Sequence, residues 1–179
     1  YLHAWFIATV ALLVSFLTLA PVAEVDEGDQ VAVFGGTDAM TLALQYQQAA
    51  PLRVPGTPGA DAGEKWITEQ FQRLPDGDRR VAIQRAVVRR EGERIPIANV
   101  LFTVPAGSQT KSQRNILVVA PRDAPRQVSG GGSGTAMLAE LARIAGRSKY
   151  HHPLIFLSVD ADTLRNAGLR WYLSSVETS

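Results

Sequence analysis

Cysteine is absent from this 179-residue sequence, which excludes disulfide bonds and metal sites built on thiolates. An excess of either charge is also absent, because 18 Lys and Arg residues are balanced by 17 Asp and Glu residues. The composition therefore offers no electrostatic basis for binding nucleic acid. Hydrophobic residues make up 46% and charged residues 20%, proportions that are typical of a globular domain rather than of a disordered chain.

Charged side chains are also absent from residues 1–22. A helix of this length rises about 33 Å, enough to span the roughly 30 Å hydrocarbon core of a bilayer. Tyr1 and Trp5 suit the membrane interface. A cleaved signal peptide is the alternative, because Thr18-Leu19-Ala20 has the small residues of a cleavage site, but no basic segment precedes the apolar run. We expect a transmembrane helix over residues 1–22, in contact with the lipid bilayer.

Acidic residues and glycine follow over residues 23–36, a composition that predicts a juxtamembrane linker. Lys and Arg are absent directly after the apolar run, which favours a soluble domain on the non-cytoplasmic side of the membrane. The sequence thus predicts a single-pass membrane protein whose one globular domain occupies residues 37–179.

Local patterns predict alternating elements in this domain. Helices are expected near residues 37–49, 60–74, 133–146 and 164–176, and strands near residues 81–90, 94–104, 115–120 and 153–159. The first two strands should form a hairpin around Glu91-Gly92-Glu93, and the strand at 115–120 should be buried on both faces. This order favours an α/β fold, a three-layer αβα domain with a mixed sheet.

A series of motifs runs along residues 38–176. They are Arg53-Val54-Pro55-Gly56-Thr57-Pro58-Gly59, Trp66-Ile67 with Phe71, Asn99-Val100, Val118 to Asp123, Ser133-Gly134, Leu138 to Arg143, and Phe156 to Tyr172. In this order the sequence resembles the zinc-dependent family of aminopeptidases, glutamate carboxypeptidases and the transferrin receptor. The resemblance implies a zinc exopeptidase-like domain. Because that family's domain continues with further strands and ligands, the resemblance implies one of two arrangements: a natural half-domain, or a domain completed by a further part of the chain.

The resemblance further implies that metal ligands are replaced. Where the family has a histidine, a bridging aspartate and a glutamate on zinc, this chain has Pro121, Gly130 and Thr163. Proline and glycine have no side-chain donor, and threonine is a poor substitute for a carboxylate. Asp123 is retained, and its family counterpart orients the ligand histidine, while Asp162 stands at the first position of the family's glutamate pair. We therefore predict no catalytic residue, no metal ligand, no cofactor-binding residue and no cofactor.

Three further features carry weaker signals. Ser133 follows a glycine run, but a nucleophile elbow requires glycine where Thr135 stands, so we expect Ser133 to cap a helix. The adjacent histidines 151 and 152 project in different directions, which favours a loop without a metal. A basic cluster near the first strand lacks interleaved aromatic residues, which favours a solvated surface or the rim of a protein contact over nucleic acid. The cluster comprises Arg79, Arg80, Arg85, Arg89 and Arg90.

These observations support one leading hypothesis and two alternatives. The leading hypothesis is a membrane-anchored pseudopeptidase that is not an enzyme and serves as a structural or interaction subunit of a larger membrane complex. Its expected partners are the bilayer and other subunits of that complex. The first alternative is a membrane-anchored metallo-aminopeptidase or other hydrolase, completed by a C-terminal half and using Asp123 and Asp162. The second is a cleft near Gly130 and Asp162 that binds a peptide or small ligand without turnover.

Overall fold

The structure, a computed structural model, describes residues 33–107, 114–124 and 132–177. The chain divides into two units, Tyr1–Val31 and Ala32–Ser179. The predicted transmembrane helix over residues 1–22 and most of the predicted linker over residues 23–36 lie outside the described residues and stay predictions. Within the described ranges, none of the helices combines the length and the apolar content needed to cross a bilayer.

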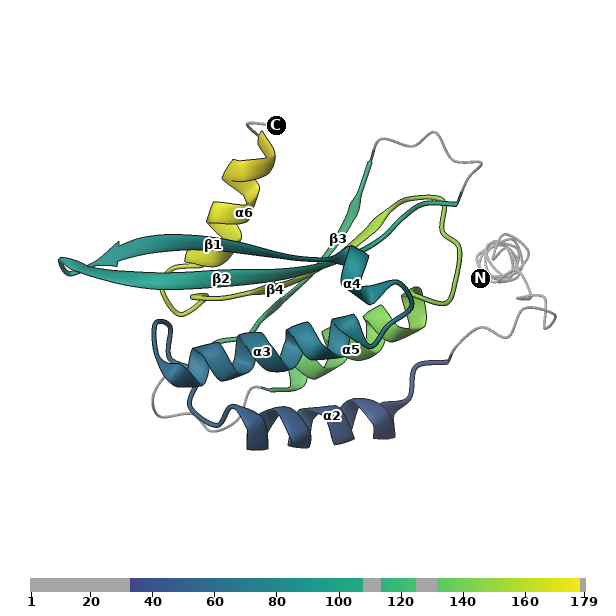
Figure 1. The fold of residues 1–179 in the computed structure, drawn as a ribbon, viewed down its shortest axis with the longest axis horizontal. Helices are drawn as coiled ribbons and strands as arrows, with labels where there is room; N and C mark the ends of the chain where they lie inside the picture. The colour runs from purple at the N-terminus through teal and green to yellow at the C-terminus, as the bar shows by residue number, and fades with distance from the viewer. Residues whose placement is uncertain (1–32, 108–113, 125–131, 178–179) are drawn as a thin grey trace, which may run out of the picture. The chain divides into compact units, whose positions relative to one another are not determined.

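A four-stranded sheet with the order β1-β2-β4-β3 runs through the second unit (Figure 1). Its strands are β1 (Val81–Arg90), β2 (Glu93–Val104), β3 (Ile116–Pro121) and β4 (Leu154–Val159). β2 is antiparallel to both β1 and β4, whereas β3 and β4 are parallel. The sheet is therefore mixed, as predicted.

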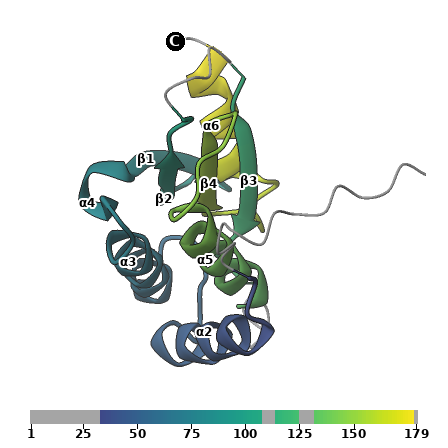
Figure 2. The ribbon, with the colours of Figure 1, turned by 90° about the vertical axis from the view of Figure 1, so that its right-hand side faces the viewer.

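Helices lie on both faces of this sheet (Figures 1 and 2). On one face are α3 (Pro58–Gln72) and α5 (Ser133–Ala145), and on the other is α6 (Ala167–Glu177). α2 (Gly36–Ala49) packs mainly on α5, and α4 (Gly77–Arg80) is one turn that leads into β1. The expected three-layer α/β architecture is confirmed.

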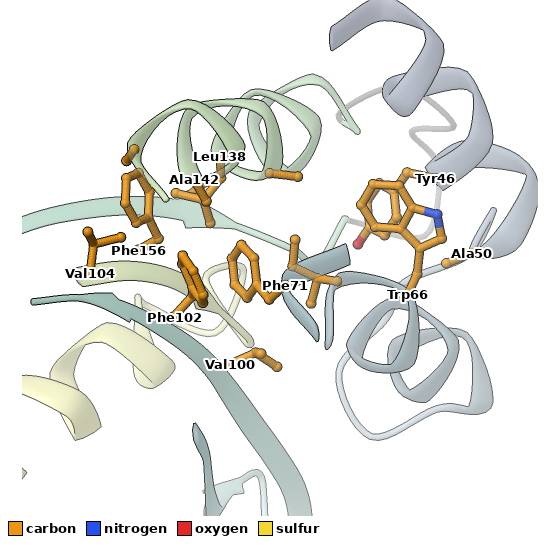
Figure 3. Packing of buried hydrophobic residues seen from close by; sticks show 14 residues of the cluster. Tyr46, Ala50, Trp66, Phe71, Val100, Phe102, Val104, Leu138, Ala142 and Phe156 are labelled. Atoms are coloured by element: carbon orange, nitrogen blue, oxygen red, sulfur yellow. The ribbon is translucent and has the colours of Figure 1, made fainter. Parts of the chain in front are cut away.

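Aromatic side chains join α3 to the central strands (Figure 3). Helical spacing places Trp66 and Phe71 on one side of α3, and both are buried. Phe71 stacks on Phe102 of β2 with 5.4 Å between ring centroids, and Phe102 lies 6.4 Å from the ring of Phe156 on β4. Because β4 pairs with both β2 and β3, this packing holds in place the strands whose carboxyl ends carry the candidate site.

The β1-β2 connection is one residue shorter than predicted. Glu91 and Gly92 have φ values of 53° and 87°, and Glu93 already pairs with Arg90 in the ladder. Two consecutive positive φ angles are typical of a type I′ turn, whose twist matches that of the flanking strands.

Two local predictions are wrong. The strand at 115–120 is not buried on both faces, because Ile116 and Val119 of β3 remain 48% and 38% exposed. β3 is an edge strand of the described sheet, and α6 packs against β1 and β2. Ser133 does not cap α5 either: the N-cap position belongs to Gly132, and no side chain bonds the helix end there.

Candidate functional site

Two aspartates meet at the carboxyl ends of the parallel strands β3 and β4. In open α/β sheets, ligands bind at the carboxyl ends of the strands. The carboxylate of Asp123 accepts hydrogen bonds from the backbone N–H groups of Asp162 and Thr163, each at 2.9 Å, and from the Thr163 hydroxyl at 2.5 Å. Asp123, which follows β3, therefore holds the turn that follows β4.

The Asp162 carboxyl is half-buried beside this anchored carboxylate. Burial raises the pKa of Asp162 above its usual value, and the negative charge of Asp123 raises it further. A carboxyl group with a raised pKa holds its proton closer to neutral pH than a solvated one, and this property suits a general acid or base. The two aspartates can therefore serve proton transfer.

Arg122 anchors the end of β3 to the adjacent strand β4 and, beyond it, to β2. Its guanidinium is buried and donates hydrogen bonds to the carbonyl of Ala98 on β2 at 2.5 Å and to that of Ser158 on β4 at 3.2 Å. It also lies 3.5 Å from the carboxylate of Asp160. Because Arg122 directly precedes Asp123, these contacts fix the position of the backbone from which the Asp123 side chain extends.

The carbonyl of Arg122 is held from the helical side. Nε of Arg53 donates to this carbonyl at 3.1 Å, and the Tyr46 hydroxyl donates to it at 2.9 Å. The Arg53 guanidinium carbon lies 4.8 Å from the centroid of the Tyr46 ring, a cation–π contact. Burial raises the pKa of Tyr46 to about 12, so the hydroxyl keeps the proton that it donates.

Asp160 and Asn99 tie α6 to the same edge. Asp160 accepts the backbone N–H of Ala161 at 2.8 Å and that of Ala98 at 3.2 Å. Burial raises the pKa of Asp160, and the Arg122 charge opposes this shift. Asn99 accepts the backbone N–H of Asp160 at 3.2 Å and donates to the carbonyl of Gly168 at 2.8 Å.

The structure describes two of the three positions at which the resemblance implies replaced zinc ligands. Pro121 ends β3, and its carbonyl accepts the Thr135 hydroxyl at 3.1 Å. Thr163 bonds Asp123, and Gly130 lies outside the described residues. Within the described ranges, no group of three or more His, Cys, Asp or Glu residues could hold a metal ion. The prediction that the chain has no catalytic, metal-binding or cofactor-binding residue stays untested.

The weaker sequence signals do not converge on this edge. Ser133 is the exposed first residue of α5, and histidines 151 and 152 precede β4 at the end opposite to Asp162. The basic cluster is divided: Arg80 pairs with Asp76 at 2.9 Å, Arg85 pairs with Glu64 at 2.5 Å, and arginines 89 and 90 lie near the hairpin tip.

Sequence reasoning missed the roles of the buried arginines and of Asp160. Arg122 and Asp160 each directly follow a strand, and both are buried. The sequence signal that could have indicated these roles was a charged residue directly after an apolar strand. Its partners were not visible in the sequence, because Arg122 bonds residues up to 76 positions away.

Neither a protein-family model nor a curated protein matches the chain. Solved structures do match it. A glutaminyl cyclase from an Acidobacteriales bacterium is 21% identical with a TM-score of 0.65, and the match covers 78% of this chain and 49% of that chain. A Zn-dependent exopeptidase from Parabacteroides distasonis is 19% identical with a TM-score of 0.57, covering 73% and 48%. A leucine aminopeptidase precursor from Bacteroides thetaiotaomicron is 19% identical with a TM-score of 0.59, covering 74% and 49%.

The fold is that of zinc exopeptidases and glutaminyl cyclases. This confirms the exopeptidase-like α/β domain expected from the sequence motifs. The chain spans about half the length of these solved proteins, whose matches cover 48–49% of them. At these identities the likeness concerns the fold, and what the chain does is a matter for proposal.

The prediction that this protein is not an enzyme is contradicted by the same comparisons, because the proteins that share its fold are named as enzymes. That prediction treated three replaced positions as the whole site. The structure instead places a pair of carboxylates, one of them with a raised pKa, at the edge of the sheet where such folds bind ligands.

Proposed function

We propose that this chain forms part of an enzyme that acts on the terminal residue of a peptide. The observation that carries the proposal is the pair of Asp123 and Asp162 at the carboxyl ends of β3 and β4. The shared fold with an exopeptidase, a leucine aminopeptidase and glutaminyl cyclases supports this substrate class. Because the chain spans about half the length of those proteins, a second half-domain that completes the site is part of the proposal.

Asp162 is the proposed general base and acid. In a hydrolytic reaction, its carboxylate takes a proton from water while the water oxygen attacks the carbonyl carbon of the terminal peptide bond. As the C–N bond breaks, the protonated carboxyl returns the proton to the leaving amine. Asp123 positions the turn that carries Asp162, and its charge keeps the pKa of Asp162 raised.

The described residues do not by themselves fit a zinc site. Asp123 already accepts three hydrogen bonds, and the Asp160 carboxylate is engaged by two backbone N–H groups and by Arg122. Asp162 is left as a single carboxylate donor at this edge of the described structure. Metal analysis of the purified protein addresses this point: one zinc per chain would place the remaining ligands outside the described residues.

Activity measurements on the intact protein test the proposal. The substrates are a panel of amino-acid p-nitroanilides and a peptide that begins with glutamine. Asp162→Asn should lower kcat/KM by about 100-fold or more, the usual contribution of a positioned acid or base. Asp78→Asn, an exposed acid on α4, is the matched control and should retain full activity. Absence of turnover on the whole panel, or equal rates for Asp162→Asn and the wild type, would contradict the proposal.

We further propose that the protein is held in a membrane by residues 1–22, with its domain on the non-cytoplasmic side and beside other subunits. The uncharged N-terminal run supports the anchor, and the exposed Ile116 and Val119 on the edge strand β3 favour a neighbouring chain. Resistance of the protein to alkaline extraction from membranes tests the anchor. Isolation in mild detergent tests the partners, and a protein that elutes alone as a monomer contradicts the subunit role.

A further inference from the structure

A groove of about 980 Å³ lies between the tip of the β1-β2 hairpin and α6. The hairpin contributes Arg89 and Arg90 to its walls. The turn after β4 and helix α6 contribute Arg165, Arg170 and Trp171. Figure 1 shows how α6 rises beside the hairpin on the face of the sheet opposite to α3 and α5. Arginine residues from two segments that are distant in sequence thus line one concave surface.

The positive charge of this groove is incompletely neutralised. Two acidic residues, Glu91 and Glu177, line it together with the four arginines. Arg90 lies 3.5 Å from Glu91, but both side chains are largely exposed, so this ion pair is weak. Arg89, Arg165 and Arg170 are exposed and form no ion pair within the described part of the chain.

The groove also has an apolar component and leads to the candidate site. Trp171 and Leu173 line it and are 44% and 46% exposed, which offers apolar contacts beside the charges. Thr163 lines it as well, and both its hydroxyl and its backbone N–H bond Asp123. Thr163 therefore connects the groove to one of the two carboxylates of the candidate site.

We propose that this groove binds an acidic segment of the peptide on which the enzyme acts. This inference rests on the proposed function, because it assigns a substrate class to the same site. Guanidinium groups bind carboxylates through paired, charge-assisted hydrogen bonds, so glutamate and aspartate side chains are the ligands that suit a groove lined by arginines. The connection through Thr163 to Asp123 favours a peptide over a lipid surface. Among the described residues, Trp171 is the one aromatic residue that lines the groove, and the chain has a net charge of +1; both argue against nucleic acid as the ligand.

Fluorescence anisotropy with a labelled peptide of ten glutamates tests the proposal on the intact protein. We expect Arg165→Glu with Arg170→Glu to weaken binding by about tenfold or more, because each lost charged hydrogen bond has an effect of that order. Arg79→Glu with Lys149→Glu changes the net charge equally at exposed positions outside the groove and should leave the dissociation constant within about twofold. A ten-glutamine peptide should bind about tenfold more weakly than the glutamate peptide.

Several outcomes would overturn the proposal. They are failure of the glutamate peptide to bind, equal weakening in both double variants, and groove-dependent binding of anionic lipid vesicles without binding of the peptide. Arg165→Gln with Arg170→Gln, checked by circular dichroism, provides a milder second variant. Asp162→Asn separates this proposal from the proposed function, since it should lower kcat/KM by about 100-fold or more while leaving peptide binding within about twofold.

Discussion

Tyr46 illustrates at the residue scale how one hydroxyl contributes to the candidate site. It donates to the carbonyl of Arg122, while its ring lies under the guanidinium of Arg53 and beside Trp66. The backbone before Asp123 is held at two points. Tyr46 and Arg53 bond the carbonyl of Arg122, and the Arg122 guanidinium bonds carbonyls of β2 and β4. The polar network therefore acts through the backbone and requires no contact between Tyr46 and the carboxylates.

Tyr46 also leads to a pH prediction. Its pKa is about 12 in the folded protein and 10.0 ordinarily, so the unfolded chain loses this proton at the lower pH. The protonated Tyr46 hydroxyl therefore contributes fully to the free energy of unfolding below about pH 10. This contribution is lost as the pH rises to about 12, and the free energy of unfolding falls by at most about 1.4 kcal/mol per pH unit. Urea unfolding across this range should show a shallower decline for Tyr46→Phe than for the wild type.

Ile67→Val is the control for this measurement. Ile67 is buried in the same core, and its truncation should lower the free energy of unfolding by about 0.5–1.5 kcal/mol while leaving the pH slope unchanged. A Tyr46→Phe variant with the slope of the wild type would show that the buried hydroxyl does not titrate in this range.

At the scale of elements, the hairpin tip and α6 form the two walls of the groove. Each is placed by a local backbone feature: a two-residue turn connects β1 to β2, and Arg165 and Asn166 adopt φ values of 57° and 56° just before α6 begins. These left-handed residues explain why α6 begins at Ala167 rather than at the predicted residue 164.

Substitution of Gly92 tests the hairpin. Gly92 has a φ of 87° in open space, so an added Cβ meets no atom but forces a side chain into a left-handed conformation. Gly92→Ala should lower the free energy of unfolding by about 1–2 kcal/mol. Gly36→Ala, also in open space but at the start of a helix, should be neutral or slightly stabilising. Equal effects of the two substitutions in urea unfolding would contradict a conformational origin.

At the scale of the whole molecule, the edge of the sheet at β3 has no neighbouring strand among the described residues. Two exposed apolar side chains, Ile116 and Val119, lie along it. Such an edge favours pairing with another chain or with further strands of the same domain. The half-length coverage of the solved neighbours is consistent with a surface of this kind.

A lysine on this edge tests whether it drives association. Val119→Lys should weaken concentration-dependent association of the protein in mild detergent by about tenfold, because a charged side chain on an edge strand disfavours pairing. Leu52→Lys introduces the same charge at an exposed loop residue and should leave association unchanged. Analytical ultracentrifugation measures both, and equal association of Val119→Lys and the wild type would exclude a role for this edge.

The type and order of most elements could be predicted from the sequence. The expected strand at residues 81–90 matches β1, because the turn at Glu91 and Gly92 and the pattern of alternating residues are local signals. The four-residue α4 was missed, since one helical turn has no periodicity to detect. The exposure of β3 could not be predicted, because the residues of a strand do not indicate which strands lie beside it in the sheet.

The sequence by itself determined where helices and strands form, because apolar spacing and turn residues act over a few neighbouring positions. Through the resemblance it also named Asp123 and Asp162, but only for the alternative hypothesis of a hydrolase. Only the tertiary structure decided that these two, 39 residues apart, meet in one hydrogen-bonded site held by Arg122. Their meeting depends on the register of β3 against β4 and on buried contacts with Tyr46 and Arg53, which arise only when the whole sheet and its helices pack together.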